Sequence, residues 1–293
     1  MSNLTNIIIL VTGATGKQGG ATARHLLNAG VSVRALTRKP EGKSAQTLRA
    51  SGIEVIKGDF NDRASLDAAM KGVHGVFSVQ NFWELGTGKK ETTQSNNLTD
   101  AAVRQGVKHL CFASIARCDD NPNLAHFVTK YENEQYIRQS GVPFTFLRAV
   151  YFMDNLKPNT GSASFSWSIL ESVLGKTTTM QMIACEDIGW FAAYALLNPG
   201  EWMGKTLDIA GDNLTYPQLQ EAYTRVFGHS PKKSALAKLL IPLFMPEIRK
   251  MFNWYRESRF HADIAHLRTI HPGLLCIEDY FQMLKARMEQ TRD

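Results

Sequence analysis

The first half of the chain alternates short, β-branched apolar runs with longer stretches in which apolar residues recur at helical spacing. The run from Ile7 to Val11 is apolar at every position, as expected of a parallel strand covered by helices on both faces. Strands that alternate with helices in this way indicate βαβ units and a parallel sheet. The predicted strands cover residues 7–11, 31–36, 55–56, 73–79, 109–113 and 144–147, and the predicted helices cover 18–29, 44–51, 63–70, 93–105 and 128–140.

The pattern loosens after Val150. The stretch from Asn155 to Ser168 is polar and predicts a loop, whereas Thr178 to Leu197 predicts one further strand and helix. Thr206 to Ile209 predicts another strand, and the chain after residue 215 is mainly helical in pattern. We therefore expect an α/β fold with a Rossmann-type doubly wound parallel sheet over residues 1–155, to which 178–200 return, and a smaller, mainly helical domain from 156–177 and 201–293.

A glycine-rich segment, V-T-G-A-T-G-K-Q-G-G from Val11 to Gly20, follows the first strand and begins the first helix. The first glycine permits a tight turn, the second lets the backbone approach a pyrophosphate, and the third allows the helix to pack closely on the strand. Amide groups at the helix start then hold the phosphates. The predicted ligands are Gly13, Thr15, Gly16, Lys17, Gln18 and Gly19. An ordinary glycine-rich turn is the alternative.

The second strand ends in a basic turn, and no acidic residue occurs before Glu41. A carboxylate at this point would accept hydrogen bonds from the ribose of NAD and repel a 2′-phosphate, whereas a guanidinium pairs with that phosphate. Thr37 and Arg38 are therefore predicted to select NADP(H), and a solvated basic turn is the alternative. Asp59 and Phe60 follow the third strand, where we expect the adenine ring, unless Asp59 caps the next helix.

The net charge of +6 lies in the first 150 residues, which hold 18 Lys and Arg against 12 Asp and Glu. The remaining residues hold 15 of each class. An anionic cofactor explains this distribution, and the chain has no base-reading motif or long basic run, so we expect no nucleic acid. A DNA-binding repressor that uses Lys232 and Lys233 is the weaker alternative.

No apolar run approaches the roughly 20 residues needed to span a bilayer. The four cysteines lie far apart, without the pair spacing of a metal site. We expect reduced thiols, no metal, no membrane contact and a cytoplasmic location.

These segments together resemble the NmrA-like branch of the atypical short-chain dehydrogenase/reductase superfamily over essentially the whole chain. The glycine loop, the Arg38 turn and the Gly58-Asp59 pair are similar to that family, as are Val79-Gln80-Asn81-Phe82-Trp83 and Asp187-Ile188-Gly189. So are Gly141-Val142-Pro143 and Phe152-Met153-Asp154-Asn155. The resemblance adds Gln80, Asn81 and Phe152 to the predicted cofactor-binding residues.

Active short-chain reductases use a tyrosine four residues before a lysine, usually with a serine on the preceding strand. The resemblance places Ser114 and Lys130 at the serine and lysine positions, but His126 stands where the tyrosine is expected. We therefore treat His126, Lys130 and Ser114 as the candidate catalytic set, with Lys130 also holding the cofactor ribose. The alternative for Lys130 is a surface lysine beside Glu132 and Glu134.

The missing tyrosine favours a redox-responsive regulator that senses the NADPH/NADP+ ratio and controls a protein partner. Such a sensor would work if the two cofactor forms bind two conformations with different affinities. The alternative is an NADPH-dependent quinone or carbonyl reductase, whose apolar pocket Phe82, Trp83, Phe152 and Trp167 would supply. A homodimer is compatible with either interpretation.

Overall fold

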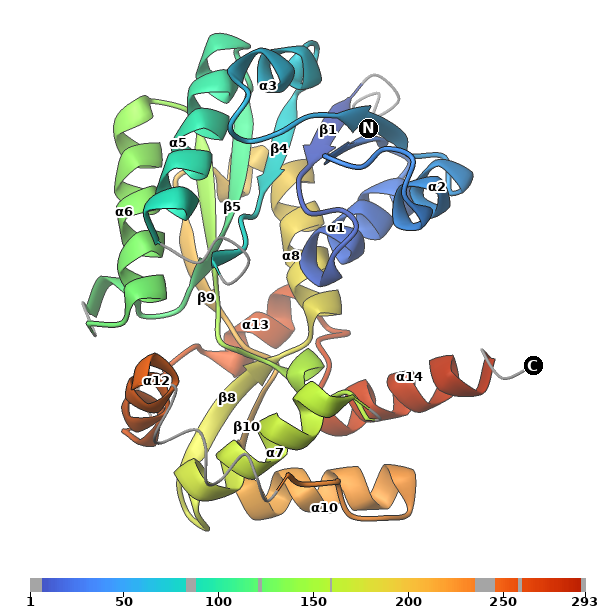
Figure 1. Cartoon of the computed structure of the whole chain (residues 1–293), viewed down its shortest axis with the longest axis vertical. Helices are drawn as coiled ribbons and strands as arrows, with labels where there is room; N and C mark the ends of the chain where they lie inside the picture. The colour runs from blue at the N-terminus through green and yellow to red at the C-terminus, as the bar shows by residue number, and fades with distance from the viewer. Residues whose placement is uncertain are drawn as a thin grey trace. The chain divides into compact units, whose positions relative to one another are not determined.

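A computed structural model describes residues 7–82, 88–120, 123–158, 160–234, 246–257 and 260–290. The chain divides into two compact units (Figure 1). The first unit comprises 1–121, 125–148 and 188–207, and the second comprises 122–124, 149–187 and 208–293. Within the described ranges, no helix has both the length and the apolar character that crossing a membrane requires.

The first unit is built around a seven-stranded sheet in the order β3-β2-β1-β4-β5-β6-β9. The pairings of β1 with β2 and with β4 are parallel, as are those of β2 with β3 and of β4 with β5. The strand order reverses between β1 and β4, which is where open α/β sheets bind ligands at their carboxyl edge. The strands are β1 (Ile8–Val11), β2 (Ser32–Thr37), β3 (Glu54–Lys57), β4 (Gly75–Ser78), β5 (His109–Ile115), β6 (Phe144–Ala149) and β9 (Thr206–Ile209).

Helices cover this sheet on both faces, with α5 and α6 on one side and α1 and α8 on the other (Figure 1). Because both faces are covered, the central strands β1, β4, β5 and β6 are buried along most of their length. Val76, Leu110, Phe112 and Phe146 belong to one apolar core. The helices are α1 (Lys17–Asn28), α2 (Lys43–Ala50), α3 (Arg63–Met70), α5 (Gly88–Arg104), α6 (Ala125–Ser140), α8 (Cys185–Leu197) and α9 (Pro199–Trp202), with a 3-10 turn at Cys118–Asp120.

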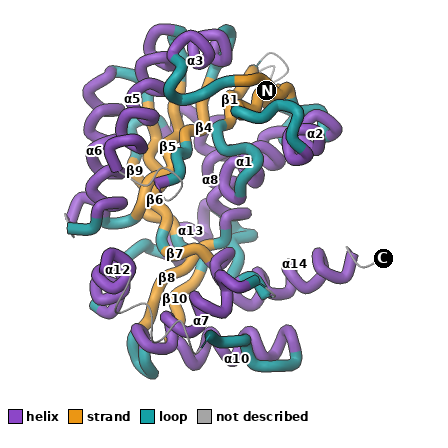
Figure 2. The backbone as a smooth tube through the Cα atoms, in the orientation of Figure 1, coloured by secondary structure: helices purple, strands orange, loops and turns teal. Residues whose placement is uncertain are grey.

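The second unit contains a three-stranded sheet in the order β10-β8-β7, surrounded by helices (Figure 2). The central strand β8 runs antiparallel to β10 and parallel to β7. The strands are β7 (Tyr151–Phe152), β8 (Thr179–Ile183) and β10 (Asp212–Thr215). The helices are α7 (Gly161–Leu174), α10 (Tyr216–Phe227), α12 (Pro246–Arg256), α13 (Ile264–Ile270) and α14 (Ile277–Gln290), with a 3-10 turn at Met153–Leu156.

The prediction of a loop over Asn155 to Ser168 is wrong for most of its length, because α7 begins at Gly161. Its serine hydroxyls bond within the helix, as Ser168 Oγ does to the carbonyl of Ser164 at 3.0 Å. Trp167, Leu170 and Leu174 are buried along one side. The hydroxyls are therefore compatible with the helix, and the apolar spacing rather than the serine content indicates the element.

Of the predicted return of residues 178–200 to the first domain, only the part from Ile188 onward lies in the first unit. Strand β8 joins the smaller sheet, and the segment that belongs to the first unit is Ile188–Leu207. Thr206–Ile209 lies in the larger sheet as β9, beside β6. The residue before β9 accepts a hydrogen bond from β6, since Phe146 N–H donates to Lys205 O at 3.0 Å. Strand pattern predicts an extended segment but not its pairing partner, since pairing depends on residues distant in sequence.

His109 at the start of β5 is 3% exposed, and its Nε2 lies 2.8 Å from Thr145 Oγ1. The Thr145 hydroxyl donates to Trp202 O at 2.7 Å, so it accepts from the Nε2–H group of His109. Burial lowers the pKa of His109 to about 4.

This histidine is expected to make stability pH-dependent. In the unfolded chain the pKa of His109 is near 6.5. Its full contribution to the free energy of unfolding is therefore present above that pH and is lost as the pH falls toward 4. The loss amounts to about 3 kcal/mol, in addition to any contribution from carboxylates. Urea unfolding between pH 7.5 and 4.5 should show a smaller loss for His109→Gln than for the unmodified protein. Equal losses in the two proteins would contradict this prediction.

Candidate functional site

Thr12 joins the ends of β1 and β4 at the carboxyl edge of the larger sheet. Its hydroxyl oxygen lies 3.1 Å from the carbonyl oxygens of Phe77 and Val79 and accepts from the Val79 amide at 2.8 Å. Its own amide donates to Phe77 O at 3.0 Å. The loop after β1 therefore begins from a rigid, fully buried anchor at the point where the strand order reverses.

The glycines of this loop are required by close backbone approaches. Gly13 has φ +60°, and a Cβ there would lie 2.8 Å from a methyl group of Val79. A Cβ on Gly19 would lie 2.4 Å from the carbonyl oxygen of Gly13 and 2.5 Å from that of Thr12. The first turn of α1 thus packs directly against the loop backbone, and no larger residue fits at position 19 without moving that backbone.

The result is an exposed cradle at the start of a 12-residue helix. Gly16 is the residue that precedes α1, and it supplies no capping side chain. The first turn contains no acidic residue, and Gly13, Thr15, Gly16 and Lys17 are exposed. Since the first turn of a helix presents amide groups that have no intrahelical acceptor, this cradle fits a phosphate.

Helix α8 packs closely on α1, again at a glycine. A Cβ on Gly189 would lie 2.5 Å from the carbonyl carbon of Ala21 and 2.6 Å from the amide nitrogen of Thr22. The Asp187-Ile188-Gly189 segment, noted in the sequence only as a family resemblance, therefore contributes a glycine that lets α8 support the cradle helix.

The ends of β2 and β3 lie at the same edge of the sheet. Gly58 N–H donates to Thr37 O at 3.1 Å, and Arg38 is exposed directly after Thr37. The Asp59 carboxylate accepts from the backbone and side-chain amides of Asn61 at 2.8 and 3.0 Å.

Asp59 is not the residue that caps the following helix. That role belongs to Asp62, whose carboxylate accepts from the Ser65 amide at the start of α3. The ring of Phe60 is half-buried and packs partly against the apolar core.

The residues after β4 are described only in part. Gln80 is buried and donates from Nε2 to Ser78 Oγ at 3.0 Å, and its Oε1 has no hydrogen-bond partner in the described part of the chain. Asn81 is exposed. Trp83 lies outside the described residues. Phe152 lies on β7 in the second unit, where it is half-buried.

Lys130 on α6 forms a buried ion pair with Glu91 on α5. Lys130 is 7% exposed, and its Nζ lies 2.9 Å from a carboxylate oxygen of Glu91, which is fully buried. The other oxygen accepts from Thr129 Oγ1 at 2.6 Å, and the ammonium lies 5.0 Å from the centre of the Phe112 ring. The interpretation of Lys130 as a surface lysine beside Glu132 and Glu134 is therefore wrong.

Sequence reasoning missed Glu91, because the predicted helix began at residue 93, after it. The helix in the structure begins at Gly88, and Glu91 lies on the buried face with Ser95 and Leu98, four and seven residues later. A carboxylate on the same helical face as Leu98 and Ala102 is the signal that could have indicated a buried cationic partner.

Ser114 belongs to a second buried charged cluster. Its hydroxyl donates to Glu134 Oε1 at 2.6 Å, and Arg148 binds both oxygens of Glu134, at 2.9 and 2.7 Å. Arg148 also donates to Asp119 at 2.8 Å. Burial, reinforced by the Glu134 carboxylate, raises the pKa of the neighbouring Cys118 thiol to about 12. This thiol is therefore protonated and unreactive at neutral pH.

His126 lies one turn before Lys130 on α6 and is buried among aromatic rings. The centre of its imidazole is 5.7 Å from that of Phe82 and 4.9 Å from that of Phe127. An imidazole thus occupies the position at which short-chain reductases are expected to have a phenol.

Comparison with known proteins agrees with the fold. The NmrA-like family matches residues 5–270. The chain is 41% identical over 230 residues to (4-alkanoyl-5-oxo-2,5-dihydrofuran-3-yl)methyl phosphate reductase of Streptomyces griseus, covering 75% of this chain and 74% of that protein. It is 27% identical over 228 residues to quinone oxidoreductase 2 of Escherichia coli, covering 75% of each.

Solved structures share the fold at lower identity. Triphenylmethane reductase of Citrobacter sp., complexed with NADP(H), matches with a TM-score of 0.76 and 22% identity, over 95% of this chain and 99% of that chain. The Escherichia coli quinone oxidoreductase complexed with NADPH matches with 0.76 and 23%, over the same shares. NmrA, a negative transcriptional regulator in complex with NADP, matches with 0.74 and 18%, over 98% of each chain.

Proposed function

Because this chain belongs to the NmrA-like family, we propose that it is an NADPH-dependent oxidoreductase that reduces a small quinone or carbonyl compound. The observation that carries the proposal is the glycine cradle at the start of α1, where a Cβ at position 19 would collide with the loop backbone. The relatives named as a reductase and as a quinone oxidoreductase, at 41% and 27% identity, support reduction as the reaction.

Each part of the cofactor would meet a residue of suitable chemistry. The cradle from Gly13 to Gly19 would hold the pyrophosphate through backbone amides. Thr37 and Arg38 would bind the 2′-phosphate, and Asp59 and Phe60 would contact the adenine. Gln80, with an unpartnered buried oxygen, would accept a hydrogen bond from the cofactor, while Asn81 and Phe152 are further proposed contacts.

The bound dinucleotide would supply the hydride, and the protein must orient the reactants and provide a proton. Lys130 has three N–H donors and forms an ion pair with Glu91 at 2.9 Å, so its ammonium could also donate to ribose hydroxyls. His126 would donate the proton, since an imidazole N–H group can act as a general acid. Ser114 is the weakest of the three catalytic candidates, because Glu134 already accepts from its hydroxyl.

The proposal is tested by NADPH consumption with a panel of quinones and small carbonyl compounds, with cofactor binding measured on the same sample. We expect turnover above about one per second with at least one compound. His126→Phe should abolish this turnover and leave NADPH affinity unchanged. Tight NADPH binding without turnover on any compound would contradict the proposal.

A redox-responsive regulator is the second candidate. Two observations favour it: the imidazole in place of the expected phenol, and the engagement of Ser114 by Glu134. A regulator should bind NADPH and NADP+ with unequal affinities and should bind a protein partner according to their ratio. In that case His126→Phe would leave both binding and the ratio dependence intact.

Cofactor preference provides a test of Arg38. A guanidinium that binds the 2′-phosphate contributes charge-assisted hydrogen bonds, worth about 2 kcal/mol, which corresponds to a loss of roughly 30-fold in affinity. Arg38→Gln should therefore raise the Kd for NADPH by about that factor and leave the Kd for NADH unchanged. The matched control is Arg49→Gln, because Arg49 on α2 is paired with Glu41. Equal effects of the two substitutions would show that Arg38 acts only through general charge.

A further inference from the structure

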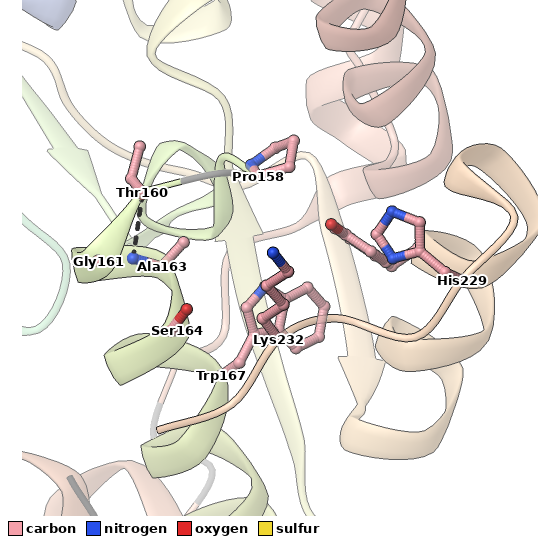
Figure 3. Close-up of a pocket in the computed structure, with 9 residues that line it drawn as sticks. Pro158, Thr160, Gly161, Ala163, Ser164, Trp167, His229 and Lys232 are labelled. Carbon is pink, nitrogen blue, oxygen red and sulfur yellow. Dashed lines mark hydrogen bonds between the residues drawn. The ribbon is translucent and has the colours of Figure 1, made fainter. Parts of the chain in front are cut away.

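The second unit contains a cavity of about 310 Å3 between the start of α7 and the segment that follows α10 (Figure 3). Ligand pockets in proteins begin at about 300 Å3, so this space suits a compound of one or two rings. All of its lining residues belong to the second unit, whereas the proposed cradle for the dinucleotide belongs to the first.

The lining of the cavity includes one positively charged side chain, that of Lys232. His229 also contributes to it, and no Asp or Glu among the described residues does. The next residue, Lys233, is different, because its Nζ lies 2.7 Å from a carboxylate oxygen of Glu171. Lys232 has no such ion pair in the described part of the chain, so its positive charge is available to a ligand. Figure 3 shows its side chain between Thr160 and His229.

The start of α7 adds further positive character. This helix is 14 residues long, has no acidic residue in its first turn, and begins at Gly161, which lines the cavity. Thr160 Oγ1 accepts from the Ala163 amide at 3.1 Å, so the cap satisfies one of the first-turn amides and leaves others to a ligand. The helix dipole and Lys232 therefore favour an anion at the same end of the cavity.

Two aromatic side chains form an apolar wall of the cavity. Trp167 and Tyr223 contact edge to face, with ring centres 5.2 Å apart, and they are 1% and 3% exposed. Burial raises the pKa of Tyr223, so the hydroxyl keeps its proton at neutral pH. The wall therefore offers a hydroxyl donor beside an apolar ring surface.

We propose that this cavity is a binding site for a small organic anion, a carboxylate or phosphate ester carried on an apolar ring. The anionic group lies against Lys232 and the start of α7, and the ring packs against Trp167 and Tyr223. An inorganic anion would not pack against Trp167 and Tyr223, and an uncharged ring would not pair with the Lys232 ammonium.

The test is calorimetric titration of the full chain with cinnamate, phenyl phosphate, cinnamyl alcohol and inorganic phosphate, with and without saturating NADPH. We expect cinnamate or phenyl phosphate to bind at least about tenfold more tightly than cinnamyl alcohol and inorganic phosphate. Lys232→Met should weaken that binding by about tenfold or more, while the control Lys233→Met changes it less than about threefold. Tyr223→Phe should weaken it by a few-fold and keep the ring packing.

Several results would overturn the site. One is absence of binding by both organic anions, and another is equal binding of cinnamyl alcohol and cinnamate. Equal losses in Lys232→Met and Lys233→Met would show that only general charge acts. Displacement of the anion by NADPH would place it in the dinucleotide cradle instead. Thermal unfolding of each variant verifies that it is folded, and the titrations without NADPH remain informative even if the proposed oxidoreductase activity fails.

Discussion

Gly19→Ala is expected to abolish dinucleotide binding. The added Cβ would lie 2.4 to 2.5 Å from two carbonyl oxygens of the loop, and these belong to the backbone, so they cannot rotate away as a side chain would. The loop must move, and the amides that face the phosphates move with it. We expect the Kd for NADPH to rise by at least about 100-fold, since phosphate affinity here depends on backbone geometry.

The measurement is NADPH binding by calorimetry, together with thermal unfolding. Overpacking at this position should also destabilise the fold by about 1–3 kcal/mol. Gly200→Ala is the matched control, because a Cβ on Gly200 would meet no atom within 4 Å and its φ is not positive. If Gly19→Ala bound NADPH as tightly as Gly200→Ala, the cradle would not be the phosphate site.

The second large effect is expected at the pair of Glu134 and Arg148. Arg148→Met would leave a fully buried carboxylate without the guanidinium that binds both of its oxygens. Removing one partner of a buried ion pair typically costs about 3–5 kcal/mol, because the remaining charge is uncompensated. The free energy of unfolding in urea should fall by about this amount.

A double variant separates the charge from the packing. Glu134→Leu combined with Arg148→Met removes both charges, and it should recover most of the stability lost in the single variant. Arg104→Met is the control, because Arg104 and Asp67 form an exposed pair, and its loss should cost less than about 1 kcal/mol. A double variant as unstable as Arg148→Met would show that packing, rather than the unpaired charge, dominates.

These two predictions differ in how far the sequence could supply them. The cradle follows from local rules, because a strand, three glycines at fixed spacing and a helix occupy the single continuous segment 8–28. The steric reason for each glycine concerns atoms within that segment or next to it, so the motif could be interpreted before the fold was available. The basic turn at Arg38 was predictable for the same reason.

The charged clusters could not be predicted in this way. Glu91 and Lys130 lie on different helices, and Glu134 reaches Arg148 across a helix and a strand. A sequence shows that a residue is charged, but whether it is buried and with which partner depends on helix packing. From sequence alone, Lys130 could therefore be interpreted as a surface residue and Ser114 as a catalytic serine. In the structure Lys130 pairs with Glu91, and Ser114 donates to Glu134.

The sequence was thus sufficient for the αβ alternation, the glycine cradle and the family, since each depends on short-range spacing and on side-chain chemistry that does not change with context. Only the tertiary structure determined that β8 belongs to the smaller sheet and β9 to the larger one. It also determined which carboxylate forms an ion pair with Lys130 and which with Arg148. It also brought Trp167, Tyr223 and Lys232 to one cavity. The physical reason is that strand pairing and burial are set by contacts between residues far apart in the chain.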